Sequence, residues 1–240
     1  MQIYSKTDKG LVRDTNQDVF FAAELENDVA FAMVCDGMGG ANAGNVASET
    51  AVKTISDYII HSYRPKMDEF AIEKLLKNAI ESANIEIYDK ALKNAELFGM
   101  GTTVVLTVIR GEKAIIAHVG DSRAYKISES ITQLTRDHSV VQSLLESGKI
   151  TEEASKVHPR KNVITRALGA EESVIPDIST VSFLKGEKIL LCSDGLSSML
   201  SKEKILDIIK SSKEDVAEKL VSAANDMGGR DNITVVLLVG

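Results

Sequence analysis

The chain has 240 residues, of which 44% are hydrophobic and 26% are charged, and its formal net charge is −7 at pH 7. This composition is that of an ordinary soluble globular protein, and the length suits one domain of sandwich or barrel architecture. The acidic residues are spread along the chain, which argues against nucleic acid or an anionic membrane as the main partner. We therefore expect a single domain over residues 1–240 that acts as a monomer.

Neither the first residues nor the two cysteines indicate export. The first eight residues lack the apolar core of a signal peptide, and no stretch is long and apolar enough for a membrane span. Cys35 and Cys192 lie far apart and outside any Cys-x-x-Cys motif, which suits a reducing compartment. We therefore expect a cytoplasmic protein, and we interpret Cys35 as a small core residue and not as a metal ligand.

The N-terminal half predicts strands followed by two helices. Strands are expected at residues 2–5, 19–23 and 29–34, the last two joined as a hairpin through a turn near Asn27 and Asp28. The uniformly apolar run 29–34 ends at Asp36 and a group of glycines, which predicts a buried strand that stops at a loop of bare backbone. Apolar residues then recur every three or four positions over 47–59, and again over 72–87 after a start near Asp68.

The C-terminal half returns to strands. They are expected at residues 102–109, 113–119 and 124–127, and then as a hairpin of 174–183 with 188–192. The polar stretch 137–166, with a short helix at 140–146, is interpreted as an excursion over the surface. Two helices at 202–210 and 214–225 precede a β-branched strand at 233–239 that suits burial on both faces. Consecutive helices between blocks of antiparallel strands favour an α+β fold with helices packed on sheets.

Five aspartates stand where an apolar strand meets a turn: Asp18, Asp36, Asp121, Asp194 and Asp231. A single Asp-Gly after a strand is usually only a turn. If the strand ends meet at one edge, however, the carboxylates converge, and two unit charges about 4 Å apart repel by about 4 kcal/mol at an effective dielectric constant of about 20. Divalent cations can offset this repulsion, and oxygen ligands select Mg²⁺, Mn²⁺ or Ca²⁺ over Zn²⁺. Two such ions sharing a carboxylate can hold a hydroxide and a phosphoryl group.

Several basic residues have a functional and a simpler interpretation. The guanidinium of Arg13, upstream of Asp18, suits bidentate contact with phosphate oxygens, whereas a solvated surface arginine is the simpler alternative. For Arg123 and Arg230 we adopt the surface interpretation. His118 follows alternating apolar residues and is interpreted as a buried or rim histidine satisfied by hydrogen bonds, not as a ligand.

Three other chemistries do not fit the sequence. The glycines of residues 37–42 begin like a dinucleotide fingerprint, but position 42 is Asn42 and no βαβ unit surrounds it. No lysine follows a glycine loop in the manner of a nucleoside-triphosphate site. A cysteine phosphatase needs an arginine six residues after its nucleophile, and those positions are Ala41 and Ser198.

Seven motifs, in the same order along the chain, resemble those of the metal-dependent protein phosphatase 2C family, and specifically its compact bacterial branch. They occupy residues 13–18, 36–40, 99–103, 118–123, 164–169, 193–196 and 229–234. The resemblance implies two antiparallel sheets packed as a sandwich with helices on both outer faces, in α/β/β/α layers. It also implies a flap of about residues 138–165 over one end, which helps to choose the protein substrate.

The resemblance implies roles for the aspartates. By position, Asp36 would bridge two Mg²⁺ or Mn²⁺ ions, and Gly37 would contribute its backbone carbonyl. Asp194 and Asp231 would complete one ion, and Asp18 would assist through bound water. The implied reaction is hydrolysis of phosphoserine and phosphothreonine in proteins by a hydroxide between the two metals, in direct attack without a phosphoenzyme. An opposing serine/threonine kinase is the implied functional partner.

The resemblance also implies a third ion, and the sequence departs from the family pattern in one respect. Asp121, with Asp194, is similar to the ligands of a third, looser ion in the bacterial branch, and Arg13 matches the phosphate-binding arginine. Met38 and Ala41, however, occupy positions where some family members carry a histidine that is proposed to protonate the leaving group. We hypothesise that a water on the third ion takes this role. The alternative function is a catalytically silent relative that binds phosphoproteins or regulates, although the complete set of aspartates argues against it.

Overall fold

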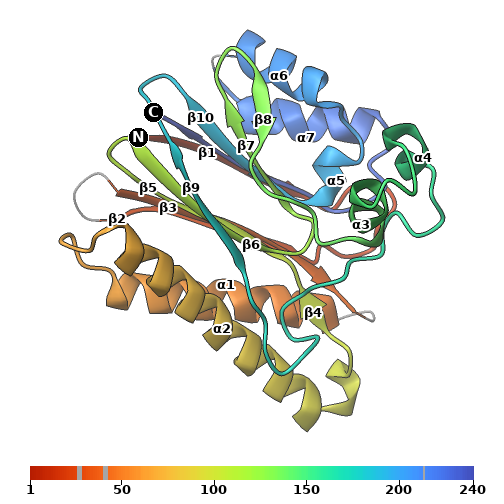
Figure 1. The fold of residues 1–240 in the computed structure, drawn as a ribbon. Coiled ribbons are helices and arrows are strands. Elements are labelled where there is room, and N and C mark those ends of the chain that lie inside the picture. The colour runs from red at the N-terminus through yellow and green to blue at the C-terminus, as the bar shows by residue number, and fades with distance from the viewer. Residues whose placement is uncertain (26–28, 40–42, 213) are drawn as a thin grey trace.

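The computed structural model describes residues 1–25, 29–39, 43–212 and 214–240. Two antiparallel β-sheets pack face to face, and helices cover the outer face of each (Figure 1). This arrangement confirms the expected α+β sandwich with α/β/β/α layers. The turn expected near Asn27 and Asp28, and the positions of Gly40, Ala41 and Asn42, lie outside the described residues.

The first sheet has the strand order β1–β11–β10–β7–β8, and the second has the order β2–β3–β5–β6–β9, with the short β4 paired to β3. The strands of the first sheet are β1 (Gln2–Asp8), β7 (Arg123–Ile127), β8 (Ile131–Gln133), β10 (Lys188–Cys192) and β11 (Ile233–Val239). Those of the second are β2 (Asp18–Leu25), β3 (Val29–Met38), β4 (Gly101–Thr102), β5 (Val104–Arg110), β6 (Lys113–Val119) and β9 (Asp177–Ser182).

Helices α1 and α2 pack on the second sheet, whereas α6 and α7 pack on the first (Figure 1). The helices are α1 (Ala43–Ser62), α2 (Glu69–Lys93), η1 (Ala95–Leu97), α3 (Val140–Glu146), α4 (Glu152–Lys156), α5 (Asp194–Ser197), α6 (Lys202–Ser211) and α7 (Val216–Asp226). Asp68 caps α2 by accepting a hydrogen bond from the amide of Ala71 at 2.8 Å, as its position in the sequence predicted. None of the helices in the described ranges is long and apolar enough to cross a bilayer.

Central strands are apolar on both faces because both faces are covered. In β3, Ala32 and Val34 face the other sheet, whereas Met33 and Cys35 face α1 and α2. β11 repeats the pattern, with Val236 directed between the sheets and the alternate residues directed towards the helices α5–α7. The expected burial of the last strand on both faces is therefore confirmed.

The structure corrects two expectations about the strands. The apolar strand does not stop at Val34, because β3 continues to Met38, and Gly37 and Met38 pair with β4. The expected hairpin of residues 174–183 with 188–192 is also wrong. β9 pairs with β6 in one sheet, whereas β10 pairs with β7 and β11 in the other. The connection crosses between sheets because Phe183 is buried between them and donates its amide hydrogen bond to the carbonyl of Glu112.

Several chain reversals meet at one end of the sandwich. Asp18 at the start of β2 lies opposite Asp36 near the end of β3. At the same end, β10 leads into α5, and β11 begins after a glycine turn. The helices α3, α4 and α5 lie at this end, away from the two termini (Figure 1). Strand ends that are far apart in the sequence are thus brought to one edge.

Candidate active site

A pocket of about 550 Å³ opens at this end of the sandwich. Six of the seven residues that the sequence singled out line it: Arg13, Asp36, Gly37, Asp121, Asp194 and Asp231. They come from the segment before β2, the end of β3, the turn after β6, the start of α5 and the segment before β11. The seventh, Asp18, is 5% exposed and lies beneath the pocket as the cross-strand partner of Asp36.

The backbone of Asp36 is fixed by neighbouring threonines. Its amide donates to Thr103 Oγ1 at 3.1 Å, and its carbonyl accepts from Thr102 Oγ1 and from the amide of Thr103, both at 2.9 Å. Burial, followed by the nearby carboxylates of Asp18 and Asp194, raises the pKa of Asp36 well above its usual range. The chain thus fixes the backbone of Asp36 but, among the residues that the structure describes, places no basic side chain in an ion pair with its carboxylate.

Asp18 is the most deeply buried of the five aspartates. Its Oδ2 accepts a 2.7 Å hydrogen bond from Ser193 Oγ, whereas Oδ1 is buried and has no hydrogen-bond partner among the described residues. Burial raises the pKa of Asp18 to about 7, and the hydrogen bond from Ser193 opposes this rise. Buried carboxylate oxygens without a donor are rare in proteins, so this one fits a site that takes up water or a cation.

Asp121 and Asp194 are also buried acids. Burial and then the neighbouring carboxylate of Asp231 raise the pKa of Asp194 to about 6. Burial and then Asp194 raise the pKa of Asp121 to about 7. Gly120 before Asp121 has a φ of +109°, and a Cβ there would lie 2.6 Å from Thr103 Cβ, so only glycine fits this turn.

Arg13 and Asp231 form the one ion pair within the pocket lining in the described ranges. Arg13 Nη2 lies 2.7 Å from Asp231 Oδ2, and the arginine side chain remains 55% exposed. The amide of Asn232 donates to Asp231 Oδ1 at 3.0 Å. Arg13 is therefore neither buried nor simply solvated, because Asp231 holds its guanidinium at the pocket wall with further N–H groups available.

Hard divalent cations fit this donor set. Its donors are carboxylate oxygens and the carbonyl of Gly37, the kind of ligand that Mg²⁺ and Mn²⁺ prefer. Within the described residues, no three of these aspartates have ligand oxygens within 4.8 Å of one another. Carboxylates bound directly to the same ion come within about 4.2 Å, twice the Mg²⁺–oxygen distance. Binding would therefore draw these side chains together or include water ligands.

Comparisons with known proteins agree with this geometry. A family model described as Protein phosphatase 2C matches residues 7–233. The chain belongs to the protein phosphatase 2C family. The serine/threonine phosphatase stp of Listeria monocytogenes is 40% identical over 236 residues, which cover 97% of this chain and 93% of that protein.

Solved structures of related phosphatases have the same fold. Serine/threonine phosphatase Stp1 from Staphylococcus aureus superposes with a TM-score of 0.93 at 34% identity, covering 100% of this chain and 94% of that one. The catalytic domain of the serine/threonine protein phosphatase PstP, in complex with 2 manganese ions, has a TM-score of 0.84 at 31% identity and covers 98% of this chain and 96% of that one.

In this phosphatase 2C chain, the reason for a glycine at position 37 differs from the expected loop of bare backbone. A Cβ at Gly37 would lie 2.2 Å from the carbonyl oxygen of Gly44 and 2.7 Å from that of Gln17. The backbone of β3 therefore packs directly against the start of α1 and the segment before β2. Close packing of the chain on itself, and not room for a ligand, explains the missing side chain.

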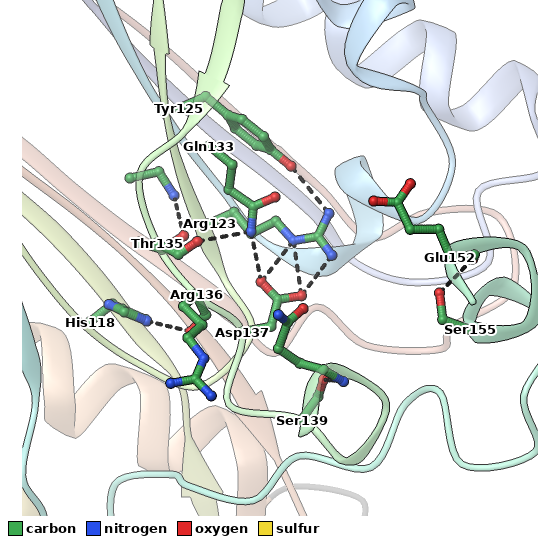
Figure 2. Close-up of polar contacts among 12 residues, drawn as sticks. His118, Arg123, Tyr125, Gln133, Thr135, Arg136, Asp137, Ser139, Glu152 and Ser155 are labelled. Carbon is green, nitrogen blue, oxygen red and sulfur yellow. Dashed lines mark hydrogen bonds and ion pairs between the residues drawn. The ribbon is translucent and has the colours of Figure 1, made fainter. Parts of the chain in front are cut away.

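The surface interpretation of Arg123 is wrong. Arg123 is largely buried, and its Nε and Nη2 donate to both carboxylate oxygens of Asp137, with Nη2 2.6 Å from Oδ2 (Figure 2). Gln133 Nε2 adds a 3.0 Å hydrogen bond to Asp137, and Arg123 Nη1 donates to the hydroxyl of Tyr125 at 3.2 Å. Arg230 is exposed, as expected.

Sequence reasoning missed the residues that hold the pocket wall. Asn232 accepts from the amide of Gln17 at 2.8 Å and donates to the carbonyls of Lys9 and Thr15, both at 2.9 Å. Ser193 and Thr103 support Asp18 and Asp36 in the same way. These three supporting residues lie inside the family motifs, and Ser193 and Asn232 stand directly beside Asp194 and Asp231, so the motifs were the available signal. Asn162 and Ile164 also line the pocket; Ile164 begins the motif 164–169, whereas Asn162 lies outside the motifs.

One further group of titratable side chains lies near the pocket. His118, His138 and Asp177 are, in the part of the chain that the structure describes, the one group whose ligand atoms all lie within 4.8 Å of one another. The two imidazole rings are stacked, with centroids 4.7 Å apart and planes 20° apart. Their lone pairs therefore lie in two separate, nearly parallel planes, so both cannot point at one ion. His118 Nε2 lies 2.8 Å from the carbonyl oxygen of Arg136 (Figure 2), which fits the expected hydrogen-bonded histidine.

Proposed function

We propose that this chain is a metal-dependent serine/threonine protein phosphatase that hydrolyses phosphoserine and phosphothreonine in proteins. The observation that carries the proposal is the meeting of Arg13 with the carboxylates of Asp36, Asp121, Asp194 and Asp231 in one pocket, with Asp18 directly beneath. Relatives over nearly the whole chain are described as serine/threonine phosphatases. A cation stabilises acidic side chains that repel one another, and both cations and a guanidinium bind the oxygens of a phosphate monoester.

The pocket suits two to three Mg²⁺ or Mn²⁺ ions. We assign Asp36 as the residue that would hold two of them, with Gly37 contributing its backbone carbonyl, Asp194 and Asp231 completing one, and Asp18 assisting through bound water. Asp121, together with Asp194, is assigned to a third. When bound, the ions would supply Lewis-acid activation of water for direct attack on phosphorus, without a phosphoenzyme. The relative PstP in complex with 2 manganese ions supports metal binding in this fold.

The residues of the chain itself orient the substrate. Arg13 is held by Asp231 and directs its remaining N–H groups to a phosphate in the pocket. Val12 and Thr15 extend the same wall, and Ile164 contributes to the lining from residues 138–165. A substrate therefore contacts this segment, here called the flap segment, as well as the sandwich.

Protonation of the leaving group needs a residue other than Met38. Met38 lines the pocket but carries no titratable group. We propose that the Asp121 side of the pocket supports this step. Replacing Asp121 by asparagine is expected to lower phosphopeptide turnover and to change its pH profile. An unchanged rate across pH would contradict this assignment.

We further propose that residues 1–240 form one catalytic domain and act as a monomer in the cytoplasm. The substrates would be phosphoproteins made by an opposing serine/threonine kinase. Neither nucleic acid nor a membrane has a part in the proposal, because the charge is −7.

The test is hydrolysis of p-nitrophenyl phosphate and of a phosphothreonine peptide with Mn²⁺, repeated after addition of a chelator. We expect turnover of both compounds with Mn²⁺ and none with chelator. Peptide binding without turnover in the presence of Mn²⁺ would instead identify a silent phosphoprotein-binding relative.

A further inference from the structure

The flap segment leaves and rejoins the sandwich beside Gly120. The amide of His138 donates to the carbonyl of Gly120 at 2.9 Å, and the amide of Thr165 donates to the carbonyl of His138 at 2.7 Å. A β-bridge pairs Ser139 with Ile164. The two ends of the segment therefore form a narrow neck that is attached to the residue directly before Asp121.

The side chain of His138 holds the other side of the same residue. The amide of Gly120 donates to His138 Nδ1 at 3.1 Å, so both peptide groups of Gly120 are bonded to one histidine. An acceptor at Nδ1 leaves the proton of the neutral ring on Nε2. Nε2 is buried, has no hydrogen-bond partner among the described residues, and lies 3.3 Å from Asp177 Oδ2.

Asp177 links the two ends of the neck. Its Oδ1 accepts a 2.8 Å hydrogen bond from Arg166 Nη1, directly after the flap segment, while its Oδ2 faces His138 at the start. Asp177 is fixed in register on β9, opposite His118 on β6. The stacked ring of His118 covers the ring of His138 on one face. The histidine is thus oriented by a carboxylate, a ring and a backbone amide.

We propose that His138 is a positioning residue that sets the place of Asp121 and of the flap segment together. The backbone of Gly120 packs tightly against Thr103, because a Cβ on Gly120 would collide with that side chain. A shift of His138 therefore moves the peptide before Asp121, and through the neck it moves Ile164, which lines the same pocket. The inference rests on the proposed function in one respect, namely that Asp121 binds a cation.

A metal ion on the two histidines is the competing explanation for this cluster. The parallel rings do not direct their lone pairs to one point, and metal at Nε2 of His138 would need the proton on Nδ1, where the amide of Gly120 already donates. A positioning role explains both contacts of the ring, and a metal site explains neither.

The test compares His138→Leu with His138→Asn. Asparagine places Oδ1 close to the position of Nδ1 and can still accept from Gly120, whereas leucine cannot. Mn²⁺ binding is measured by calorimetry, which does not depend on turnover. We expect leucine to weaken the weakest Mn²⁺ site at least about 10-fold, as is usual when a residue supporting a ligand is lost. Asparagine should stay within about 3-fold of wild type, since the acceptor is kept.

Two further measurements make the result decisive. Thermal unfolding separates stability from positioning, because a purely structural role would lower the melting temperature of both variants and leave Mn²⁺ binding unchanged. That result overturns the proposal. If the leucine variant does not fold, Asp177→Asn takes its place, since Asp177 is partly exposed; it should weaken the same site, and unchanged Mn²⁺ binding would overturn the proposal.

Zn²⁺ titration addresses the competing explanation. An extra Zn²⁺ bound by wild type and lost in His138→Asn would replace the positioning role with a metal site. Turnover is scored separately. A wild type that binds Mn²⁺ but hydrolyses nothing refutes the proposed function and leaves the calorimetric comparison valid. If the wild type is active and the leucine variant binds Mn²⁺ as tightly as the wild type, only the role of His138 is refuted.

Discussion

Asp137 and the pocket aspartates are buried or partly buried carboxylates at the same end of this sandwich, and the chain compensates their charges in opposite ways. Asp137 receives a bidentate guanidinium from Arg123 and an amide from Gln133, so its charge is compensated within the chain (Figure 2). The pocket aspartates share one partly exposed guanidinium, that of Arg13. Arg123 also lowers the pKa of Asp121 and of Asp194, but it does not outweigh their burial.

This difference shows that the fold can place a basic side chain beside an acid that has a structural role. It supplies almost no basic side chain in the pocket, where the carboxylates of five aspartates line a space open to solvent. A buried charge without a partner is costly. Such charges therefore occur mainly where a bound ligand compensates them. The following predictions test this contrast, from the largest expected effect to the smallest.

Replacing Asp36 by asparagine should reduce the turnover of a phosphothreonine peptide by at least about 100- to 1,000-fold, the cost of losing one preorganised electrostatic group from an active site. The matched control is Asp57→Asn on the exposed face of α1, which should leave turnover unchanged. Wild-type hydrolysis by the Asp36 variant would remove the assigned role of this carboxylate.

The metal-free protein should lose stability as pH rises from about 4 to 8. The folded-state pKa values of Asp18 and Asp194, about 7 and about 6, lie above the unfolded value of about 4. The folded state therefore binds more protons; its advantage is complete below pH of about 4 and is lost as pH passes through 6 to 7. Thermal unfolding in chelator should show the loss, and Mn²⁺ should reverse it most strongly at pH 8. Equal melting temperatures at pH 5 and pH 8 in chelator would contradict the prediction.

Replacing Asp137 by asparagine should lower the free energy of unfolding by about 3 kcal/mol, because it leaves the largely buried guanidinium of Arg123 without its partner. Urea denaturation with Mn²⁺ present measures the change. As a control, Glu146→Gln breaks the exposed pair with Arg136 and should cost less than about 1 kcal/mol. Equal costs for the two variants would remove the contrast between compensated core and exposed surface.

Replacing Arg13 by lysine should lower kcat/KM about 10-fold, since a point charge replaces a fork that can bind two phosphate oxygens. The neighbouring exposed Arg230 provides the control, because Arg230→Lys should have no effect. Steady-state kinetics with a phosphothreonine peptide measure both. An equal loss in the two variants would indicate general electrostatic attraction and not a specific phosphate contact.

Much of the fold and the location of the pocket could be predicted from the sequence. An uninterrupted apolar run marked β11 at its observed bounds, and the motifs singled out Asp36, Asp121, Asp194 and Asp231, which line one pocket. Local signals were sufficient there because each of these aspartates lies within two residues of a strand end. Roles of individual residues at the metal ions stay predictions.

What could not be predicted depends on pairing across space. The chain between β9 and β10 looks like a hairpin turn, but β9 pairs with β6 in the second sheet and β10 pairs with β11 in the first. The burial of Arg123 follows from Asp137, which is reached only after β7 and β8 have turned back. His138 likewise shows its connection to Gly120 only when two loops are placed together. Periodicity carries no information about such contacts.

The two cysteines have a practical consequence. Both are fully buried, and burial raises the pKa of the Cys35 thiol far above its usual range and that of Cys192 to about 12. A thiol that is neither accessible nor ionised is inert to alkylating agents and slow to oxidise. Hydrolysis by this protein should therefore persist in hydrogen peroxide or iodoacetamide at doses that inactivate enzymes with a cysteine nucleophile.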